Sequence, residues 1–248
     1  MNSPPLLRSS LAGLSVAILA GGRGTRLRSV VADRPKVLAD VAGRPFIHYW
    51  LDVLERQGCS DIVLCAGYKA EQLRDTLGHL YGELTLWYSI EEKPLGTGGA
   101  LRKALPFFQS DPVLVLNGDS FCDVNLRSFL TQHLNAGATA SLVLTRVENA
   151  SRFGRVEQQP DGRITAFHEK SAAPGPAWIN AGIYLVRPGL LAKVAANKPV
   201  SLERDLLPRW LPKRVHGCPH DGRFIDIGTP ESLAQANAFF AELNRAAA

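Results

Sequence analysis

The chain has 248 residues, of which 46% are hydrophobic, and this is enough to bury the core of one large α/β domain. Lysine and arginine exceed aspartate and glutamate by 28 − 23 = 5 charges, which are spread along the chain. This distribution favours an anionic small-molecule substrate and excludes the clustered charge of a nucleic-acid groove. No window approaches the roughly 18 apolar residues of a membrane span, so we expect no membrane partner.

The cysteines and the N-terminal region predict a cytoplasmic protein. Four widely separated cysteines form no Cys-x-x-Cys pair and have no histidine at zinc-ligand spacing: Cys59, Cys65, Cys122 and Cys218. We therefore expect reduced thiols. The apolar stretch Leu11–Ala20 behind Arg8 could suggest an export signal, but the run Val16–Ala20 leads into glycines, as a buried first strand does.

The first half of the chain alternates between apolar runs and amphipathic segments. After the strand at 16–20, Pro45 opens an amphipathic segment that stops at Gly58, which is typical helix punctuation. The remaining expected elements alternate: strands at 61–66, 84–90 and 113–116, and helices near 69–77 and 98–105. Such alternation predicts a mainly parallel, doubly wound sheet. Because ligands of these sheets bind beyond the carboxyl ends of the strands, the loops after residues 20 and 116 should share a rim.

Strands dominate the second half, which predicts an antiparallel extension of the sheet. Strands are expected at 138–147, 153–158, 163–168 and 179–186, with a hairpin turn at Gly162. Two helices near 188–196 and 202–211, a return strand ending at Ile227, and a last helix from Pro230 capped by Thr229 follow. We interpret residues 1–248 as one domain with two halves, about 14–136 and about 137–248.

The first glycine-rich loop has the composition of a phosphate-binding turn. It reads Gly21-Gly22-Arg23-Gly24-Thr25-Arg26-Leu27, and glycines let backbone N–H groups approach an anion without an intervening Cβ. A P-loop would need Gly-Lys-Ser/Thr, and a dinucleotide fingerprint starting at Gly22 would need glycine where Leu27 stands. Both are excluded, which also argues against a nicotinamide-dependent oxidoreductase.

Two cations near this loop, Arg26 and Lys36, suit a triphosphate. They could neutralise it and stabilise the charge that builds on a pyrophosphate leaving group. Taken singly, each could equally be a solvated surface charge. Their coupling to the glycines favours the functional interpretation.

Two distant aspartates are candidate ligands of Mg²⁺. Asp119, in Asn117-Gly118-Asp119, follows a buried strand, and Asp226 stands between apolar neighbours, where a lone carboxylate is costly. Mg²⁺ takes one or two carboxylates and completes its shell with waters and substrate phosphates. The alternatives are a helix N-cap for Asp119 and a structural ion pair for Asp226.

A second glycine-rich turn enters a helix and could hold a nucleoside. It spans Glu91 to Ala100 and contains Gly96-Thr97-Gly98-Gly99. Glu92 could accept hydrogen bonds from a nucleobase, although Glu91 could equally do so, or neither. Farther along the chain, Lys170 could bind a sugar phosphate, with Glu169 and Asn180 for hydroxyl groups.

Together these motifs resemble those of the sugar-1-phosphate nucleotidyltransferases, in the same order and over nearly the whole chain. The matching segments are 21–27, Pro35-Lys36, 94–100, 117–119, Glu169-Lys170, 180–182 and 226–230. The resemblance implies a Rossmann-like nucleotide-binding half, a sugar-binding half, Mg²⁺ as cofactor, and in-line attack of the sugar phosphate on the α-phosphorus of a nucleoside triphosphate. No covalent intermediate and no general base are expected.

The resemblance also implies a role for each position. The triphosphate would contact Gly21, Gly22, Gly24, Thr25, Arg26 and Lys36, and the nucleoside would contact Glu92, Gly96, Thr97, Gly98 and Gly99. Asp119 and Asp226 would hold the metal. The sugar phosphate would contact Asn117, Gly118, Glu169, Lys170 and Asn180.

Within this family the chain is most similar to D-glycero-α-D-manno-heptose 1-phosphate guanylyltransferases, which implies GTP as nucleotide and a GDP-heptose for cell-surface polysaccharide. Mannose 1-phosphate guanylyltransferases and uridylyltransferases for other sugars carry similar runs and stay as alternatives. A catalytically inactive nucleotide-sugar sensor is a more distant alternative. We expect no appended β-helix with acyltransferase activity, and the number of subunits stays open, a homo-oligomer included.

Overall fold

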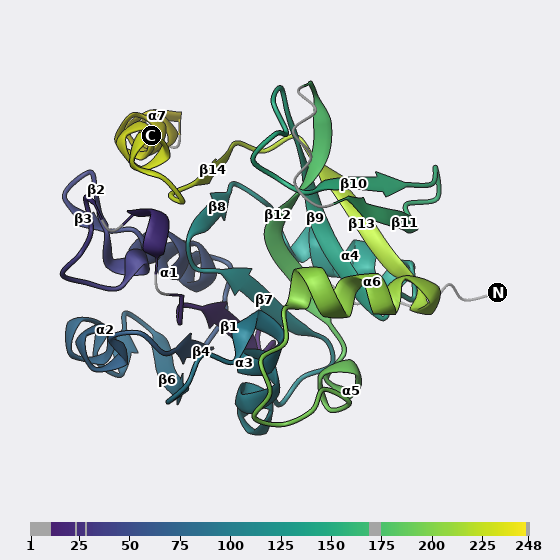
Figure 1. Cartoon of the computed structure of the whole chain (residues 1–248), viewed down its shortest axis with the longest axis horizontal. Helices are drawn as coiled ribbons and strands as arrows, with labels where there is room; N and C mark the ends of the chain where they lie inside the picture. The colour runs from purple at the N-terminus through teal and green to yellow at the C-terminus, as the bar shows by residue number, and fades with distance from the viewer. Residues whose placement is uncertain (1–10, 23, 28, 169–174, 247–248) are drawn as a thin grey trace.

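The computed structural model describes residues 11–22, 24–27, 29–168 and 175–246, and within them a ten-stranded mixed sheet runs through the molecule (Figure 1). Its strand order is β11-β10-β12-β7-β1-β4-β6-β5, and β9 and β13 extend it from β12. The prediction of an α/β fold with a mainly parallel centre and an antiparallel extension is confirmed.

The parallel strands and their crossover helices form the first half as predicted. The strands are β1 (Val16–Leu19), β4 (Asp61–Ala66), β6 (Leu84–Ile90) and β7 (Val113–Asn117), and the helices are α1 (Ile47–Arg56), α2 (Ala70–Leu77) and α3 (Gly96–Ala104). β1 lies between β4 and β7 and is parallel to both. Its side chains and those of its two neighbours are almost wholly buried, because helices cover both faces of a parallel sheet.

The antiparallel extension begins where β12 (Ala177–Val186) pairs with β7. β9 (Ala140–Val147) lies against β12, and β13 (Val215–His220) lies parallel to β9. β10 (Arg155–Gln158) and β11 (Ile164–His168) form the predicted hairpin, in which Gly162 takes a positive φ of 83°.

Three details of the fold differ from the prediction. Helix α4 (Leu126–Asn135), capped by Asn125, was not expected. The helices near 188–196 and 202–211 are short pieces: α5 (Pro188–Leu191), a π-helical turn (Leu202–Leu206), α6 (Leu207–Trp210) and a 3-10 turn (Leu211–Lys213). Pro208 and Pro212 lack the N–H that a continuous helix needs there.

The predicted return strand is two strands rather than one. After β13 the chain leaves the main sheet, and β14 (Phe224–Asp226) pairs with β8 (Ser120–Cys122) in a separate antiparallel sheet. Helix α7 (Pro230–Ala246) then begins at Pro230, and the Thr229 hydroxyl accepts a hydrogen bond from the Ser232 N–H at 3.3 Å, as the sequence predicts. Short strands complete the fold: β2 (Asp40–Val41), β3 (Arg44–Pro45) and β5 (Leu80–Tyr81).

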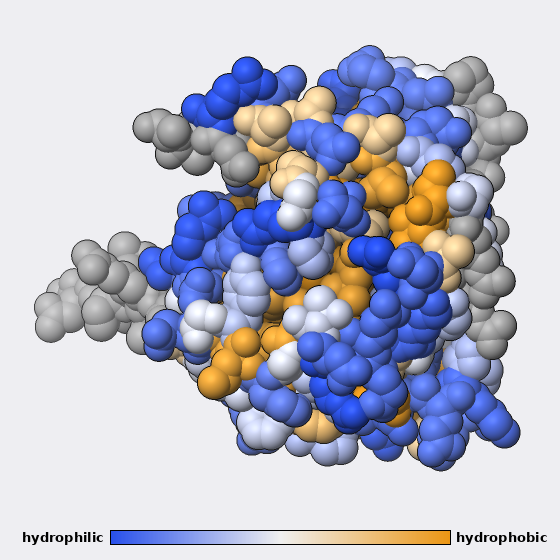
Figure 2. Space-filling model, turned by 90° about the vertical axis from the view of Figure 1, so that its left-hand side faces the viewer, coloured by the Kyte–Doolittle hydropathy of each residue, from blue (hydrophilic) through white to orange (hydrophobic). Residues whose placement is uncertain are grey.

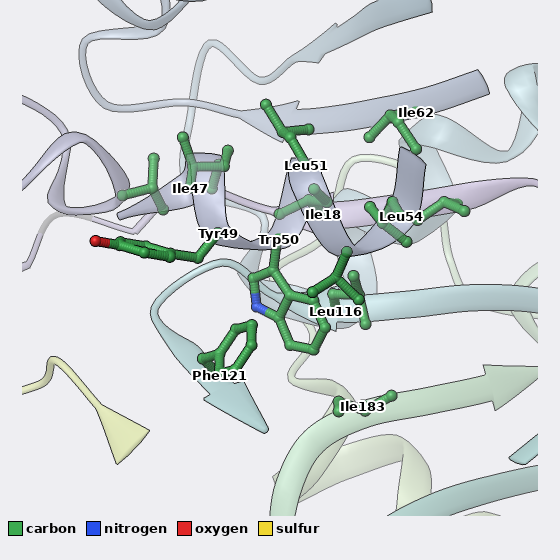
Figure 3. Packing of buried hydrophobic residues seen from close by; sticks show 14 of the residues in the cluster. Ile18, Ile47, Tyr49, Trp50, Leu51, Leu54, Ile62, Leu116, Phe121 and Ile183 are labelled. Carbon is green, nitrogen blue, oxygen red and sulfur yellow. The ribbon is translucent and has the colours of Figure 1, made fainter. Parts of the chain in front are cut away.

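The larger hydrophobic core reaches the strand that follows Asp119. Trp50 of α1 is fully buried among hydrophobic side chains (Figure 3), and its Nε1 donates a hydrogen bond to the Ser120 carbonyl of β8 at 2.6 Å. Phe121 of β8 packs against Trp50 with ring centroids 4.9 Å apart. The core thereby holds β8, and with it the loop after β7, in place.

The surface of the chain is mostly polar on the face shown in Figure 2, where apolar side chains emerge between hydrophilic ones. Among the described residues, no helix combines the length and the apolar character needed to cross a membrane.

Candidate active site

Two adjoining cavities open at the carboxyl ends of β1 and β7. The first, the rim cavity, has a volume of about 280 Å³ and is lined by residues that include Gly21, Gly22, Lys36, Glu91, Thr97 and Asp119. The second, the strand-side cavity, has a volume of about 660 Å³ and is lined by residues that include Arg26, Arg152, Asn180, Tyr184, Glu203 and Asp226. Asn117 lines both, so the two cavities share a wall.

The first glycine-rich loop borders the rim cavity, and its three glycines serve different purposes. A Cβ on Gly22 would meet no atom within 4 Å, so this backbone is open to a ligand. A Cβ on Gly21 would lie 3.1 Å from Glu91 Oε1. Gly24 takes a positive φ of 56°, and a Cβ there would lie 3.3 Å from Lys36 Cβ, so glycine lets the loop turn closely over the lysine.

The two predicted site residues that follow Gly24, Thr25 and Arg26, differ in which cavity they border. Thr25 and Arg26 begin a 3-10 turn, and Arg26 lines the strand-side cavity rather than the rim cavity. Thr25 is exposed and lines neither cavity. The loop therefore borders both cavities through different residues.

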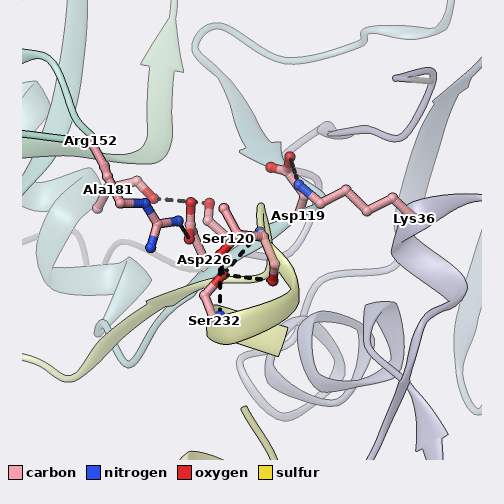
Figure 4. Close-up of polar contacts among 8 residues, drawn as sticks. Lys36, Asp119, Ser120, Arg152, Ala181, Asp226 and Ser232 are labelled. Carbon is pink, nitrogen blue, oxygen red and sulfur yellow. Dashed lines mark hydrogen bonds and ion pairs between the residues drawn. The ribbon is translucent and has the colours of Figure 1, made fainter. Parts of the chain in front are cut away.

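Asp119 and Asp226 are brought side by side although 107 residues separate them, since 226 − 119 = 107. In the β8–β14 sheet Asp226 stands opposite Ser120, and the Ile227 N–H donates a hydrogen bond to the Asp119 carbonyl at 2.9 Å. Each carboxylate is held by a cation (Figure 4): Lys36 Nζ lies 2.7 Å from Asp119 Oδ2, and Arg152 Nη2 lies 3.0 Å from Asp226 Oδ1.

The acidic pair fits Mg²⁺ better than a metal held by protein ligands alone. Within the described residues, His, Cys, Asp and Glu side chains form no group of three or more that could hold a metal ion. Mg²⁺ needs only one or two carboxylates when substrate phosphates and waters supply the other oxygens. Asp119 and Asp226 are the residues that would hold it.

The second glycine-rich turn is only partly open. Gly96 and Thr97 line the rim cavity. The N–H groups of Gly98 and Gly99, however, donate hydrogen bonds to the Val200 carbonyl at 2.9 and 3.1 Å. The segment before the π-helical turn therefore packs against these two amides, and Gly96 and Thr97 are the members of the turn that border the rim cavity.

Glu91, not Glu92, lines the rim cavity. Glu91 Oε2 accepts a hydrogen bond from the Leu95 N–H at 3.0 Å, and its other oxygen lies beside the position that a Cβ on Gly21 would occupy. Burial raises the pKa of the Glu91 carboxyl, although the Leu95 hydrogen bond opposes this. Glu92 faces a small neighbouring depression with Tyr68. The geometry therefore favours Glu91 as the acceptor for a nucleobase.

Asn117 and Gly118 lie at the end of β7, where the backbone packs closely against β1. The Gly118 N–H donates to the Leu19 carbonyl at 3.0 Å, and a Cβ on Gly118 would lie only 2.8 Å from that oxygen. Asn117 Oδ1 is buried and has no hydrogen-bond partner in the described part of the chain. Because a buried acceptor without a partner is costly, this oxygen suits a hydroxyl group of a bound ligand.

A hydrogen-bond network connects the two cavities. Asn180 Nδ2 donates to the Tyr184 hydroxyl at 2.8 Å, and that hydroxyl donates to Glu203 Oε1 at 3.1 Å. Glu203 Oε2 accepts from the Thr97 hydroxyl at 2.8 Å. Tyr184 is fully buried, and burial raises the pKa of its hydroxyl well above the usual value, so it stays a neutral donor.

The sequence singled out neither Arg152 nor Tyr184 nor Glu203. An arginine in a polar loop, a tyrosine inside an expected strand and a glutamate inside an expected helix carry no special pattern, so nothing in the sequence marks their convergence. Two predicted residues, Glu169 and Lys170, lie outside the described residues.

Comparison with known proteins agrees with this geometry. The D-glycero-alpha-D-manno-heptose 1-phosphate guanylyltransferase of Aneurinibacillus thermoaerophilus is 36% identical over 224 residues, which are 90% of this chain and 96% of that protein. The mannose-1-phosphate guanylyltransferase catalytic subunit beta of Drosophila melanogaster is 35% identical over 226 residues, which cover 89% of this chain and 61% of that protein.

Solved structures show the same likeness. The crystal structure of HddC from Yersinia pseudotuberculosis superimposes with a TM-score of 0.83 at 32% identity, over 92% of this chain and 99% of that one. The structure of the same protein complexed with GMP-PN gives a TM-score of 0.82 with the same coverage. The model of the nucleotidyl transferase family matches residues 15–242. With its two cavities meeting at a glycine loop and an acidic pair, the chain belongs to the nucleotidyl transferase family.

Proposed function

We propose that this protein transfers GMP from GTP to D-glycero-α-D-manno-heptose 1-phosphate, with Mg²⁺ as cofactor, and releases pyrophosphate. One observation carries the proposal. The backbones of Asp119 and Asp226 lie side by side where a cavity bordered by open glycine backbone adjoins a larger cavity, and each aspartate lines one of the two. The named relatives act on sugar 1-phosphates with a guanine nucleotide, which supports the choice of substrates.

The nucleotide occupies the rim cavity in this proposal, and the sugar phosphate occupies the strand-side cavity. Gly21 and Gly22 approach the triphosphate, and Lys36 neutralises it. Asn180 and the unpartnered Asn117 Oδ1 bind sugar hydroxyls, while Arg26 and Arg152 supply positive charge for the 1-phosphate. The shared wall at Asn117 brings the two substrates together.

The chemistry is one displacement at phosphorus. An oxygen of the sugar phosphate attacks the α-phosphorus of GTP, and the bond to pyrophosphate breaks. That oxygen is already ionised, so no side chain has to remove a proton, and Lys36 stabilises the charge that grows on pyrophosphate. Mg²⁺ held by Asp119 and Asp226, when bound, supplies Lewis-acid neutralisation of phosphate charge. Most of the rate enhancement comes from holding both substrates in line.

Glu91 supports guanine as the base. Guanine presents two adjacent donors, N1–H and the N2 amino group, which a carboxylate accepts together. Uracil and thymine present one N–H between two carbonyl oxygens, so the second carboxylate oxygen would face an acceptor. Leaving that mismatch in a partly buried site disfavours both pyrimidines.

Mannose 1-phosphate is the second candidate for the sugar, because relatives that act on it match 89% of this chain. A catalytically inactive sensor is disfavoured, since Arg26, Lys36, Asp119 and Asp226 are all present at the two cavities. We further propose a cytoplasmic enzyme that supplies GDP-heptose for cell-surface polysaccharide. Four buried free cysteines support a reducing compartment: Cys59, Cys65, Cys122 and Cys218.

A pyrophosphate-release assay tests the proposal. GTP, UTP, dTTP, CTP and ATP are each paired with heptose 1-phosphate and mannose 1-phosphate in the presence of Mg²⁺, and GTP with heptose 1-phosphate should give the highest turnover. Asp119→Asn should lower that turnover by about three orders of magnitude or more while the fold stays intact. The exposed Asp123 provides the matched control, Asp123→Asn. Silence with every substrate pair, or normal turnover of Asp119→Asn, would contradict the proposal.

A further inference from the structure

Both candidate metal carboxylates are paired with a cation, but the two cations differ in exposure. The side chain of Lys36 is 11% exposed, and it lies beneath the turn at Gly24. The side chain of Arg152 is 44% exposed, and it contacts Asp226, which is 22% exposed, through one guanidinium nitrogen at 3.0 Å. A partly exposed pair with an exposed arginine contributes little stability, so its partners can separate at small cost.

An aromatic side chain also helps to position Arg152. Its guanidinium lies over the Phe153 ring, 5.7 Å from the centroid, and Phe153 packs edge-on against Phe224 of β14. Phe153 therefore helps to hold the arginine beside Asp226, where Arg152 also lines the strand-side cavity. A guanidinium has five N–H donors, and in this position only one of its nitrogens is used by Asp226.

A divalent ion and a guanidinium compete for the negative charge of one carboxylate, although Arg152 contacts only Oδ1 of Asp226. An ion that binds Asp226 neutralises that charge and repels Arg152, which cannot lose its own charge by deprotonation. Because Arg152 lines the strand-side cavity, an anion bound there offers the released guanidinium a new partner, and guanidinium groups bind phosphate oxygens in pairs.

We infer that Arg152 binds the sugar phosphate by exchanging partners: it neutralises Asp226 in the empty enzyme and moves to the 1-phosphate when the metal takes Asp226. The inference rests on the function proposed above. Its consequence is cooperative binding. The metal releases the arginine that the sugar phosphate needs, and by reciprocity the sugar phosphate strengthens the binding of the metal.

Two binding measurements on Arg152→Ala test the exchange. The first is the affinity of the ligand-free enzyme for Mn²⁺, a spectroscopic substitute for Mg²⁺, by electron paramagnetic resonance. The second is the affinity for heptose 1-phosphate by calorimetry, with and without Mg²⁺, in the presence of α,β-methylene GTP, whose bond to pyrophosphate cannot break. Because Arg152 competes with the metal and binds the phosphate, the variant should change the two affinities in opposite directions.

In the wild type, Mg²⁺ should strengthen heptose 1-phosphate binding by about tenfold. In Arg152→Ala, Mn²⁺ should bind the ligand-free enzyme more tightly, whereas heptose 1-phosphate should bind at least about tenfold more weakly in Mg²⁺. The strengthening by Mg²⁺ should largely disappear. Arg152→Lys, which keeps the charge but not the paired donors, should recover part of the sugar phosphate affinity.

Arg223 provides a matched control outside the two cavities. It lies over the Phe239 ring at 4.9 Å and pairs with Glu242 at 2.7 Å, so it repeats the arrangement of Arg152 on a carboxylate that lines neither cavity. Arg223→Ala should leave both affinities unchanged.

Three outcomes are decisive. Weaker Mn²⁺ binding in Arg152→Ala would show that the arginine only supports the metal site, and it would overturn the inference. An unchanged affinity of Arg152→Ala for the sugar phosphate would overturn it as well. If the wild type itself binds neither GTP nor a sugar 1-phosphate, the proposed function fails. If it binds both and the variant behaves like the wild type, only the partner exchange fails.

Discussion

Residues 21–24 and residues 96–99 each bring three glycines to the rim of the sheet, but the two segments face different neighbours. A Cβ on Gly22 would meet nothing within 4 Å, so that backbone faces open space beside the rim cavity. A Cβ on Gly98 would lie 2.6 Å from a Leu206 methyl group, and the amides of Gly98 and Gly99 already bind Val200. Glycine marks a close approach in both segments, and only the fold decides whether a ligand or the chain itself approaches.

The largest effect that tests this contrast is expected for Gly22→Ala. The added methyl group occupies space proposed for the triphosphate and displaces it from the line of attack, so turnover should fall by about 100-fold. Stability should not change, because the methyl group meets no protein atom and the φ of Gly22 is not positive. Pyrophosphate release and thermal unfolding measure the two quantities. An unstable variant with normal turnover would show that this segment, too, serves packing.

Gly99→Ala should have the opposite profile. Its Cβ would lie 2.8 Å from the Lys198 carbonyl, which is backbone and cannot rotate away, so the free energy of unfolding should fall by about 2 kcal/mol. Urea denaturation measures this loss. Gly189→Ala in α5 is the matched control, since no heavy atom lies within 4 Å of its added Cβ, and its unfolding free energy should change by less than about 0.5 kcal/mol. Equal unfolding free energies for Gly99→Ala and Gly189→Ala would show that the glycine at position 99 is not required for packing.

Glu91 lies between the two glycine segments, beside Gly21 and bonded to the Leu95 N–H, so it can sharpen the comparison. Glu91→Gln replaces one acceptor by a donor, and the preference for GTP over UTP should fall by about tenfold. The raised pKa of Glu91 adds a pH signature. As the pH falls through that pKa, the wild type should lose GTP affinity because the protonated carboxyl accepts fewer hydrogen bonds, whereas Glu91→Gln should lack this component. Parallel pH profiles of the two proteins would argue against base recognition by Glu91.

Thr97 gives the smallest expected effect, because it belongs to the packed segment yet touches the network of the strand-side cavity. Its hydroxyl donates to Glu203 and accepts from the Leu202 N–H at 2.7 Å. Thr97→Val should lower the unfolding free energy by about 1 kcal/mol and raise the KM for the sugar phosphate more than that for GTP. Thr97→Ser keeps the hydroxyl and should restore both values. A selective rise in the KM for GTP would instead assign Thr97 to the nucleotide.

Local patterns predict the centre of this fold well. The buried run at 61–66 and the strand at 84–90 have the predicted bounds, because apolar runs between turn residues depend little on distant contacts. The short helices after Pro188 escaped prediction, since their breaks depend on single prolines and on packing. Helix α4 was not predicted, although Asn125 caps it and its ten residues are amphipathic.

The candidate site likewise has features that local patterns predict and features that depend on long-range contacts. Glycines and charges at strand ends identified the rim of the sheet, including Asp119 and Lys36. The bond from Gly98 to Val200 and the ion pair of Arg152 with Asp226 join segments about 100 and 74 residues apart, and no local pattern encodes such pairings. Long-range contacts therefore decide which members of a motif are open to a ligand.

The C-terminal helix α7 has a share in the chemistry, although none of its described residues lines either cavity. Phe240 stacks on Tyr49 at 3.6 Å and packs edge-on against Phe121 of β8 at 5.1 Å. It thus supports β8 from behind, and β8 pairs with β14 beside the two aspartates. A helix at the far end of the chain therefore helps to fix the backbone that presents both carboxylates, and truncating the fully buried Phe240 would lower stability and turnover together.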